Sequence, residues 1–515
     1  MKATILKNKN KKDWFRIKRY PHVGMQLEQK DRSWIELYVK NKAAISTHAF
    51  YPLIHRQLKV RKFRKEVCHD GTRSKLRKPS TKDREIFFAN HLDSNIYSYY
   101  SELLSYKYEE ILNEYGISNC VTAYRKIKQD PSNERSRNKC NIDFANDVFQ
   151  YIKTNQEKEQ VAITFDIKSF FDNLNHAYLK KKWRIVLKSG VDLPPDHYNV
   201  FRNITKFSYV EEDDLFEEFQ EKIIVERKPR SFKEIKIKKK NYLRNKRAVA
   251  YCSKDNIDEI RNKGLIKSNK YLFKDGVDKE LRTKGIPQGS PISANLANIY
   301  MIDFDKNAND LLVSLGGIYQ RYSDDMVAIC PKKYEKNVIE HFMSIIKDVH
   351  LEIQMSKTQI FHFLFDESTG RKKCFEKNPN TKRLQNNTVF EYLGFQFDGH
   401  FTLIKNASLS GYYRKMKKSF TRSLFYAYHN KTKTKGKIFK SRLYKRFTFK
   451  GAQRRRIYQR HPTNTNQFIL SHRYDWGNFI TYANLASNSI VDNKIAAQLK
   501  NHWRKFHKLM KDIEN

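Results

Sequence analysis

The chain has 515 residues, and its 101 Lys and Arg against 56 Asp and Glu give it a formal net charge of +45. This charge excludes basic partners and indicates polyanions such as nucleic acids. The 39% of apolar residues suffice for a large core, and the length favours more than one domain. No apolar stretch approaches the length of a membrane span, so we expect no membrane partner.

The amino terminus has no apolar signal core, so we expect the protein to stay in the cytoplasm. The six cysteines show no C-x-x-C spacing. This pattern argues against both a zinc site and a disulfide framework, and it fits a reducing compartment.

The first element with a chemical signature is a strand predicted over residues 161–165. It ends on Asp166, and helix-compatible sequence begins after Asp172. A single carboxylate at a strand end is weak evidence for a metal site. With a second acidic site beside it, the pair indicates magnesium, because magnesium prefers hard oxygen ligands.

A long connection, residues 173–284, follows this strand. It contains an acidic patch at 211–214 and a basic block at 233–247. Contiguous acids usually form a solvated face, so we predict no metal site at the acidic patch. The basic block is a candidate for contact with a template or a structured RNA.

Residues 285–298 join a turn rich in glycine and proline to a predicted helix. Gly285 and Gly289 allow another backbone or a nucleotide to approach closely. Ser290 is predicted as the N-cap, with Pro291 at the first helical position. An ordinary capped helix has the same pattern.

A hairpin is predicted over residues 317–330, with Ser323, Asp324 and Asp325 at its tip. Adjacent carboxylates repel each other, so they are normally retained where a divalent cation neutralises them, although many such pairs are solvated turns. With Asp166 brought beside the tip, the cluster would suit two magnesium ions.

The tail, residues 405–515, has 26 Lys and Arg against 4 Asp and Glu. Aromatic residues interleave with the basic ones, which suits phosphate neutralisation together with stacking on unpaired bases. A solvated charged face is the alternative. The apolar spacing over 490–513 predicts a terminal helix.

Three of these blocks resemble, in this order, the palm motifs A, B and C of reverse transcriptases: FDIKSFFDNL at 165–174, GIPQGSPISANLANIYM at 285–301 and YSDDMVAI at 322–329. The likeness continues with residues 351–358, which resemble motif D, and residues 390–397, which resemble the primer-grip hairpin. Upstream, residues 82–86 are similar to the fingers segment that holds the triphosphate, and residues 123–125 occupy the place of the next fingers motif.

The resemblance implies an α+β right-hand polymerase with fingers, palm and thumb. The palm would be an antiparallel sheet carrying the catalytic aspartates, and the thumb would be basic and mainly helical. We expect an N-terminal extension at 1–74, fingers at 75–160, a palm at 161–400 with a fingers insertion around 177–280, and a thumb or C-terminal RNA-binding region at 401–515.

The resemblance also implies catalytic roles. Asp166 and Asp324 are expected to bind two Mg²⁺ ions, with Mn²⁺ as the alternative metal, and the main-chain carbonyl of Ile167 can help. Asp325 orients or assists. Lys357 is the implied proton donor to the leaving pyrophosphate, with an ordinary surface lysine as the alternative.

For the incoming nucleotide, the resemblance implies that Arg84, with Lys82 or Lys78 nearby, neutralises the β- and γ-phosphates. Phe171 stands where the family closes on the sugar C2′ position, so the enzyme should use deoxynucleotides. Gln288 is expected near the sugar or base, with Gly289 permitting that approach.

For primer and template, the resemblance places Tyr392 and Gly394 in the primer-grip hairpin. Because the thumb follows this hairpin, the basic run Arg454, Arg455 and Arg456 is expected to contact the nucleic-acid backbone.

The implied function is RNA-directed DNA polymerisation with a noncoding RNA template, a DNA primer and product, and deoxynucleoside triphosphates. Residues 77–91 and 97–100 look like those of bacterial antiphage reverse transcriptases, which are related to group II intron and retron enzymes. The alternatives are a template-independent or protein-primed DNA polymerase of the same fold, a retron- or intron-type enzyme, and an RNA-binding protein on a retired polymerase fold. Oligomerisation stays open.

Overall fold

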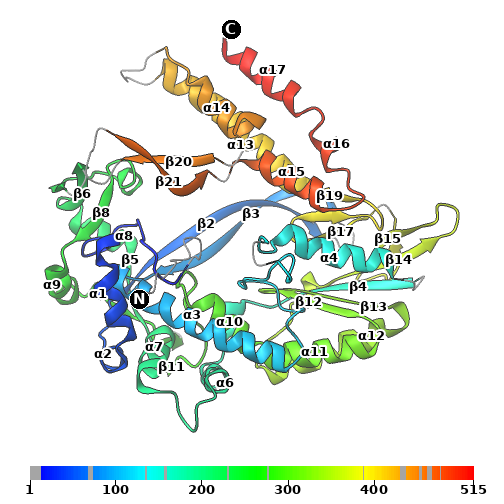
Figure 1. Cartoon of the computed structure of the whole chain (residues 1–515), viewed down its shortest axis with the longest axis horizontal. Coiled ribbons are helices and arrows are strands. Elements are labelled where there is room, and N and C mark those ends of the chain that lie inside the picture. The colour runs from blue at the N-terminus through cyan, green and yellow to red at the C-terminus, as the bar shows by residue number, and fades with distance from the viewer. Residues whose placement is uncertain are drawn as a thin grey trace, which may run out of the picture. The chain divides into compact units, whose positions relative to one another are not determined.

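The structure is a computed structural model of the whole chain (Figure 1). The described residues are 13–67, 73–133, 136–155, 159–228, 231–274, 278–386, 388–429, 436–451, 455–460, 467–475 and 477–514. The chain divides into two compact units, one of residues 1–125 and 164–358, the other of residues 126–163 and 359–515. Across the described ranges, no helix is both long and apolar enough to cross a bilayer. The fingers, palm and thumb boundaries stay predictions.

The N-terminal part of the first unit contains a long antiparallel hairpin, with the helices α1 and α2 before it in the chain and α3 after it (Figure 1). In the hairpin, β2 pairs with β3 from Ile54 opposite Phe88 to Val67 opposite Arg73. The helix that follows buries a stripe that includes Leu104, Tyr108 and Ile111, whose spacing matches the helical repeat. The elements are β1 (His22–Val23), α1 (Arg32–Lys40), α2 (Lys42–Ser46), β2 (Leu53–Val67), β3 (Arg73–Phe88) and α3 (His91–Glu114).

The long connection folds as two helices followed by small sheets. The strand orders are β1-β8-β6-β7 and β3-β2-β5-β9, and β10 pairs with β11. A core that includes Leu215, Ile223 and Tyr251 fills this part. The elements are α6 (His176–Leu187), α7 (Pro195–Thr205), β5 (Ser208–Glu211), α8 (Glu212–Phe219), β6 (Ile223–Lys228), β7 (Ser231–Ile235), β8 (Ala248–Cys252), α9 (Ile257–Asn262), β9 (Lys267–Ser268), β10 (Tyr271–Lys274) and β11 (Asp278–Leu281).

The acidic patch at 211–214 is not a uniformly solvated face. Glu212 is buried, it pairs with Arg56 and Lys240, and it accepts a 3.0 Å hydrogen bond from the Tyr251 hydroxyl. The expectation of solvated acids is therefore wrong at this residue. Two cations and a hydroxyl compensate the buried charge, so the patch joins α8 to β2.

The rest of the first unit holds the predicted motifs. The end of β4 (Glu159–Asp166) lies beside β13 in the order β12-β13-β4, and the Phe165 ring stacks on Phe342 of α12 at 4.7 Å. The other elements are α5 (Phe170–Asn173), α10 (Ser293–Tyr300), α11 (Ile302–Ser314), β12 (Ile318–Tyr322), β13 (Asp325–Pro331) and α12 (Glu335–Asp348).

The second unit contains the rest of the β4 sheet, in the order β4-β14-β15-β16, and a three-stranded sheet in the order β17-β18-β19. Phe149 of α4 stacks on Phe397 of β18 at 4.8 Å, which packs the helix on the smaller sheet. The elements are α4 (Asn141–Thr154), β14 (Gln359–Asp366), β15 (Arg371–Lys377), β16 (Leu384–Gln385), β17 (Phe390–Tyr392), β18 (Phe395–Phe397) and β19 (Thr402–Ile404).

The tail forms a helical bundle with one hairpin. Tyr412, Met416 and Phe420 repeat every four residues on α13 and bury one stripe against α14 and α17. The elements are α13 (Asn406–Tyr428), α14 (Lys440–Phe447), β20 (Arg455–Arg460), β21 (Phe468–Asp475), α15 (Phe479–Ser489), α16 (Ile495–Leu499) and α17 (His502–Glu514).

The helix expected over 490–513 is two helices. The side chain of Gln498 on α16 bonds the backbone N–H and carbonyl of Ile404 at 2.9 Å each, which holds α16 on β19. In α17, Phe506 and Met510 instead pack in the bundle core. The two segments pack on different neighbours, so the helix is interrupted between them. The apolar spacing continues across this interruption and therefore does not predict it.

Candidate active site

The acidic hairpin has a two-residue turn. β12 and β13 pair from Ile318 opposite Ile329 to Tyr322 opposite Asp325, which leaves Ser323 and Asp324 as the turn. Ser323 has a φ of +62°. Asp324 is half-buried and Asp325 is exposed. The predicted hairpin is confirmed, with Asp325 as the first residue of β13 and not part of the turn itself.

A buried arginine holds this turn from below. The Arg321 side chain is fully buried, donates to both carboxylate oxygens of Asp305 at 2.6 and 2.7 Å, and donates to the Ser323 carbonyl at 3.2 Å. It also donates to the Asn298 side chain at 3.1 Å. Since Asn298 lies on α10 and Asp305 on α11, one guanidinium fixes both helices to the acidic turn.

A tyrosine adds to the same buried network. The Tyr319 hydroxyl donates to Asp305 at 2.9 Å. Burial and the Asp305 carboxylate raise the pKa of Tyr319 far above its ordinary value, so its hydroxyl keeps the proton that it donates. Sequence reasoning gave none of these positioning residues a role.

Asp166 is the last residue of β4, on the strand next to β13. The chain after it pairs with residues 352–354: Ile167 bridges Ile353, and the Gln354 N–H donates to the Asp166 carbonyl at 2.8 Å. This pairing brings the Lys357 ammonium to 3.0 Å from Asp166 Oδ1. Two residues that lie far apart in the sequence therefore form an ion pair at the predicted site.

The donor chemistry of this region suits a hard divalent cation. Asp166, the Ile167 carbonyl and Asp324 offer only oxygen ligands, as magnesium prefers. The carboxylate of Asp166 already faces a cation, the Lys357 ammonium. Within the part of the chain that the structure describes, however, no three His, Cys, Asp or Glu side chains form a metal-binding group. The residues fit the metal by chemical type.

The turn before α10 is fixed between two other elements. The Ile286 N–H donates to the Phe171 carbonyl of α5 at 2.9 Å, and the Phe87 N–H of β3 donates to the Gln288 carbonyl at 2.7 Å. A Cβ at Gly289 would lie 2.5 Å from the Phe87 carbonyl oxygen, and Gly289 has a φ of +111°. Glycine is required there by the backbone of β3.

These contacts bring the predicted nucleotide residues onto adjoining elements. Phe171 is half-buried on α5, and Gln288 and Gly289 lie in the turn bonded to both α5 and β3. Lys82 and Arg84 lie on β3, where they are opposite Val60 and Leu58 of β2. Arg84 is exposed.

The helix that follows begins later than expected. α10 starts at Ser293 with Ile292 as its N-cap, so the prediction of Ser290 as N-cap and Pro291 as first helical residue is wrong. The Ser290 hydroxyl is buried and has no hydrogen-bond partner among the described residues, whereas Ser293 donates to the Pro287 carbonyl at 2.7 Å. The hydrogen bond from the Phe87 N–H to the Gln288 carbonyl fixes the backbone just before this point. Residues 290–292 therefore still belong to the turn, and the helix begins after them.

A buried histidine supports the same turn. His176 Nε2 lies 2.7 Å from the Gly285 carbonyl oxygen. Burial lowers the pKa of His176, which favours the neutral ring and a donated Nε2–H. Gly285 itself has a φ of +98° and lies against the Asp172 backbone. At both Gly285 and Gly289, the backbone conformation and the close neighbouring backbone therefore favour glycine.

The primer-grip residues lie in the second unit. Tyr392 ends β17, and Leu393 and Gly394, both with positive φ, form the two-residue turn to β18, as the predicted hairpin requires. The Tyr392 ring is only 5% exposed, so a nucleic acid at this hairpin would meet mainly its turn. Arg454 lies outside the described residues. Arg455 and Arg456 begin β20, and their side chains are not described.

Comparison with known families agrees with this geometry. Residues 232–397 match the family model described as "Reverse transcriptase (RNA-dependent DNA polymerase)". The matched segment contains the turn before α10, the acidic hairpin and Lys357, while Asp166 precedes it. This segment is similar to reverse transcriptase domains. The predicted α+β right-hand polymerase fold is confirmed, and the family match agrees with the predicted enzyme class, an RNA-directed DNA polymerase.

Solved structures similar to this chain include two telomerases from Candida species. An apo telomerase from Candida tropicalis, truncated from its C-terminal domain, is 11% identical, with 69% of this chain and 60% of that chain covered and a TM-score of 0.33. A telomerase from Candida albicans with a TWJ fragment of telomeric RNA is 12% identical, with 76% and 53% covered and a TM-score of 0.33. This chain thus spans less than two thirds of the length of either telomerase. No curated protein matches the chain.

Proposed function

We propose that the protein copies a partner noncoding RNA into DNA by adding deoxynucleotides to a 3′-hydroxyl. One observation carries the proposal. Asp166 ends β4, and Asp324 and Asp325 lie where the acidic turn enters the neighbouring strand β13. Carboxylates on neighbouring strands can form the kind of oxygen-rich site on which nucleotidyl transfer by two metal ions depends.

In this proposal, Asp166, Asp324 and the Ile167 carbonyl hold Mg²⁺, with Mn²⁺ as a substitute. The bound metal would lower the pKa of the 3′-hydroxyl and neutralise charge on the triphosphate. Asp325 is exposed at the start of β13 and assists from there. The Arg321 network supports the assignment, because it fixes the backbone of the turn that carries Asp324.

Lys357 has two consecutive tasks in this scheme. Before substrate binds, its ammonium balances the Asp166 carboxylate at 3.0 Å. With Asp166 holding Mg²⁺, the Lys357 ammonium would be available to donate a proton to the leaving pyrophosphate. The Lys357 side chain is 43% exposed, which leaves it room to move between the two partners.

The nucleotide would lie between the β2–β3 hairpin and the turn before α10. Arg84 and Lys82 neutralise its phosphates, and Gln288 contacts its sugar or base. Phe171 excludes a 2′-hydroxyl. The bonds that join β3, this turn and α5 support the grouping, because they tie these residues to one another.

The proposed biological role depends on the RNA that the enzyme would copy. We propose a bacterial antiphage enzyme that acts with its own RNA in the cytoplasm. Two features support this role: the likeness of residues 77–91 and 97–100 to defence-associated reverse transcriptases, and the net charge of +45, which suits a polyanion held throughout the reaction.

The test is primer extension by Asp324→Asn, with Asp310→Asn as the matched control. Asp310 is an exposed carboxylate of α11 that pairs only with Lys306 of the same helix in the described structure. We expect Asp324→Asn to abolish extension with magnesium while RNA retention stays near normal, and Asp310→Asn to retain both.

Full-rate extension by Asp324→Asn would overturn the site assignment. A parallel reaction without RNA tests template use. Extension that continues undiminished there would identify the alternative, a template-independent polymerase of the same fold.

A further inference from the structure

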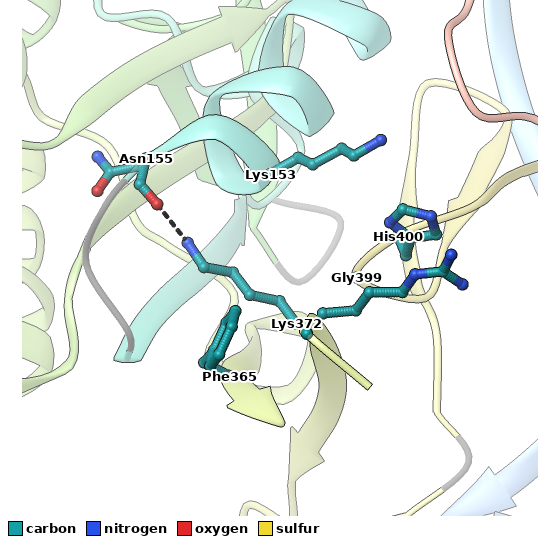
Figure 2. A pocket seen from close by; sticks show the side chains of 8 residues that line it. Lys153, Asn155, Phe365, Lys372, Gly399 and His400 are labelled. Atoms are coloured by element: carbon teal, nitrogen blue, oxygen red, sulfur yellow. Dashed lines mark hydrogen bonds between the residues drawn. The ribbon is translucent and has the colours of Figure 1, made fainter. Parts of the chain in front are cut away.

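A cavity of about 390 Å³ lies in the second unit, apart from every residue assigned above (Figure 2). Its walls come from the C-terminal end of α4 with Lys153, the end of β14 with Phe365, the start of β15 with Arg371, and the turn that contains Gly399 and His400. Four of the eight lining residues are basic: Lys153, Arg371, Lys372 and His400.

The walls are fixed by contacts within the protein. The Lys372 ammonium is buried and donates to the carbonyls of Ile152 and Asn155 and to the Gln160 side chain, at 2.8 to 2.9 Å. Figure 2 shows the bond to Asn155, with the Lys153 side chain extending away from it toward the part of the pocket where His400 lies. Lys372 is therefore a structural cation that holds α4 against β15.

The opposite wall is equally constrained. Gly399 has a φ of +104°, and a Cβ there would lie 2.3 Å from the Lys372 carbonyl oxygen, so the turn lies directly on β15. The Asp398 carboxylate accepts from the backbone N–H groups of His400 and Phe401 at 2.8 and 2.6 Å. The pocket is thus built before any ligand arrives.

Positive charge is concentrated around the cavity. The Arg371 guanidinium carbon lies 5.5 Å and the Lys494 ammonium 3.7 Å from the centre of the Phe401 ring, which holds both cations in place. Lys153 pairs with Asp492. The pKa of His400 is lowered by burial and by the nearby cations Lys153, Arg371 and Lys494, while Asp398 raises it. The imidazole ring is therefore close enough to these cations to be affected by their charge.

We propose that this pocket binds a phosphate group, carried either by a nucleic-acid chain or by a free polyphosphate. Arg371 offers a planar fork of N–H donors to two phosphate oxygens, and Lys153 adds a second charge by leaving Asp492. His400 supplies a third donor. The Phe365 ring, 41% exposed at the cavity edge, offers an apolar face to an attached base or sugar.

The test combines chemical protection with charge-removing variants of the whole chain. Phenylglyoxal modifies exposed arginines, and mass spectrometry then compares Arg371 with Arg383, an exposed arginine of the same unit outside the pocket. Each is measured without ligand, with inorganic pyrophosphate, and with a short single-stranded RNA. The variants are Arg371→Gln with Lys153→Gln, and Arg383→Gln as control, with thermal melting to verify folding.

If the phosphate belongs to a nucleic acid, RNA protects Arg371 more than Arg383. The double variant then lowers the slope of log affinity against log salt by about 0.7 for each lost phosphate contact, whereas Arg383→Gln leaves the slope unchanged. If the phosphate is free, pyrophosphate alone protects Arg371, and the double variant removes pyrophosphate binding. Equal modification of Arg371 and Arg383 under both ligands would overturn the proposal, whatever the polymerase assays give.

Discussion

At the scale of single residues, the candidate active site rests on a buried ion pair to which its motifs give no role. Arg321 and Asp305 are both fully buried, and their bidentate pair is shared with Tyr319, Asn298 and the Ser323 carbonyl. A buried ion pair of this kind stabilises the fold little more than apolar residues of the same size would. Removing one partner, however, leaves an uncompensated buried charge, which is strongly destabilising. The network therefore secures the position of the acidic turn.

Asp305→Asn should accordingly lower the free energy of unfolding by about 3 to 5 kcal/mol, because the Arg321 charge loses its counterion. Asp310→Asn, on the same helix α11 but exposed, should cost less than about 1 kcal/mol. Urea unfolding followed by circular dichroism measures both. Equal midpoints for the two variants would show that the buried pair does not secure this unit.

Phe171 allows a second prediction at this scale, which rests on the proposed function. Phe171→Ala removes the ring expected beside the sugar C2′ position, so ribonucleotide incorporation should rise relative to deoxynucleotide incorporation. Competition assays with both nucleotides measure the ratio. Since Phe171 is only half-buried, the variant should fold, and an unchanged ratio would locate sugar selection at another residue.

The sequence predicted the aspartates of the candidate site, because their residue type and position in a strand or turn indicate the chemistry. It did not predict the residues that act through burial, such as Arg321 and Asp305. Adjacent aspartates between apolar runs indicate a hairpin tip, and Asp166 ends a recognisable strand. Nothing in the sequence distinguishes Arg321 from the many exposed arginines of a basic chain, because charged residues are rarely buried unless paired. Its partner Asp305 lies on a helix whose packing only the fold determines.

At the scale of elements, the turn before α10 joins β3 to α5 through backbone contacts. The capping pattern predicted the helix α10, but the predicted start was wrong, because the preceding turn is fixed by Phe87 of β3, a contact with a distant segment. The tail shows the same limit, since α16 and α17 share one apolar pattern but pack on different partners. Local patterns define elements, whereas distant contacts define their ends.

Gly289→Ala tests this junction. A Cβ would meet the Phe87 carbonyl oxygen at 2.5 Å in a left-handed backbone region, so the variant should lose about 1 to 3 kcal/mol of stability or shift the turn away from β3. Gly411→Ala is the matched control: Gly411 lies within α13 with nothing within 4 Å of its Cβ position, and alanine should stabilise that helix by about 0.5 to 1 kcal/mol. Thermal melting should give shifts of opposite sign, and a neutral Gly289→Ala would show that β3 readily yields.

At the scale of the whole molecule, excess positive charge is the dominant property. The tail from 405 to 515 contributes 26 Lys and Arg against only 4 Asp and Glu, in a chain with a net charge of +45. Exposed aromatic rings accompany this charge on the hairpin β20–β21, where Tyr458 is 63% and Phe468 60% exposed. Cations beside open rings can bind phosphates and stack on bases together.

The basic run that leads into this hairpin gives the last prediction. Replacing Arg454, Arg455 and Arg456 by Ala removes up to three phosphate contacts, so the slope of log RNA affinity against log salt should fall by about 2 to 3 for a duplex and by less for a single strand. Removing Lys333, Lys336 and Lys347 from the exposed surface of the first unit takes away the same charge and serves as the control. Catalysis on saturating primer–template should change far less than affinity. If both triple variants keep the slope of the unmodified protein, the arginines are merely solvated, and the backbone contact lies elsewhere in the tail, first of all between residues 431 and 450.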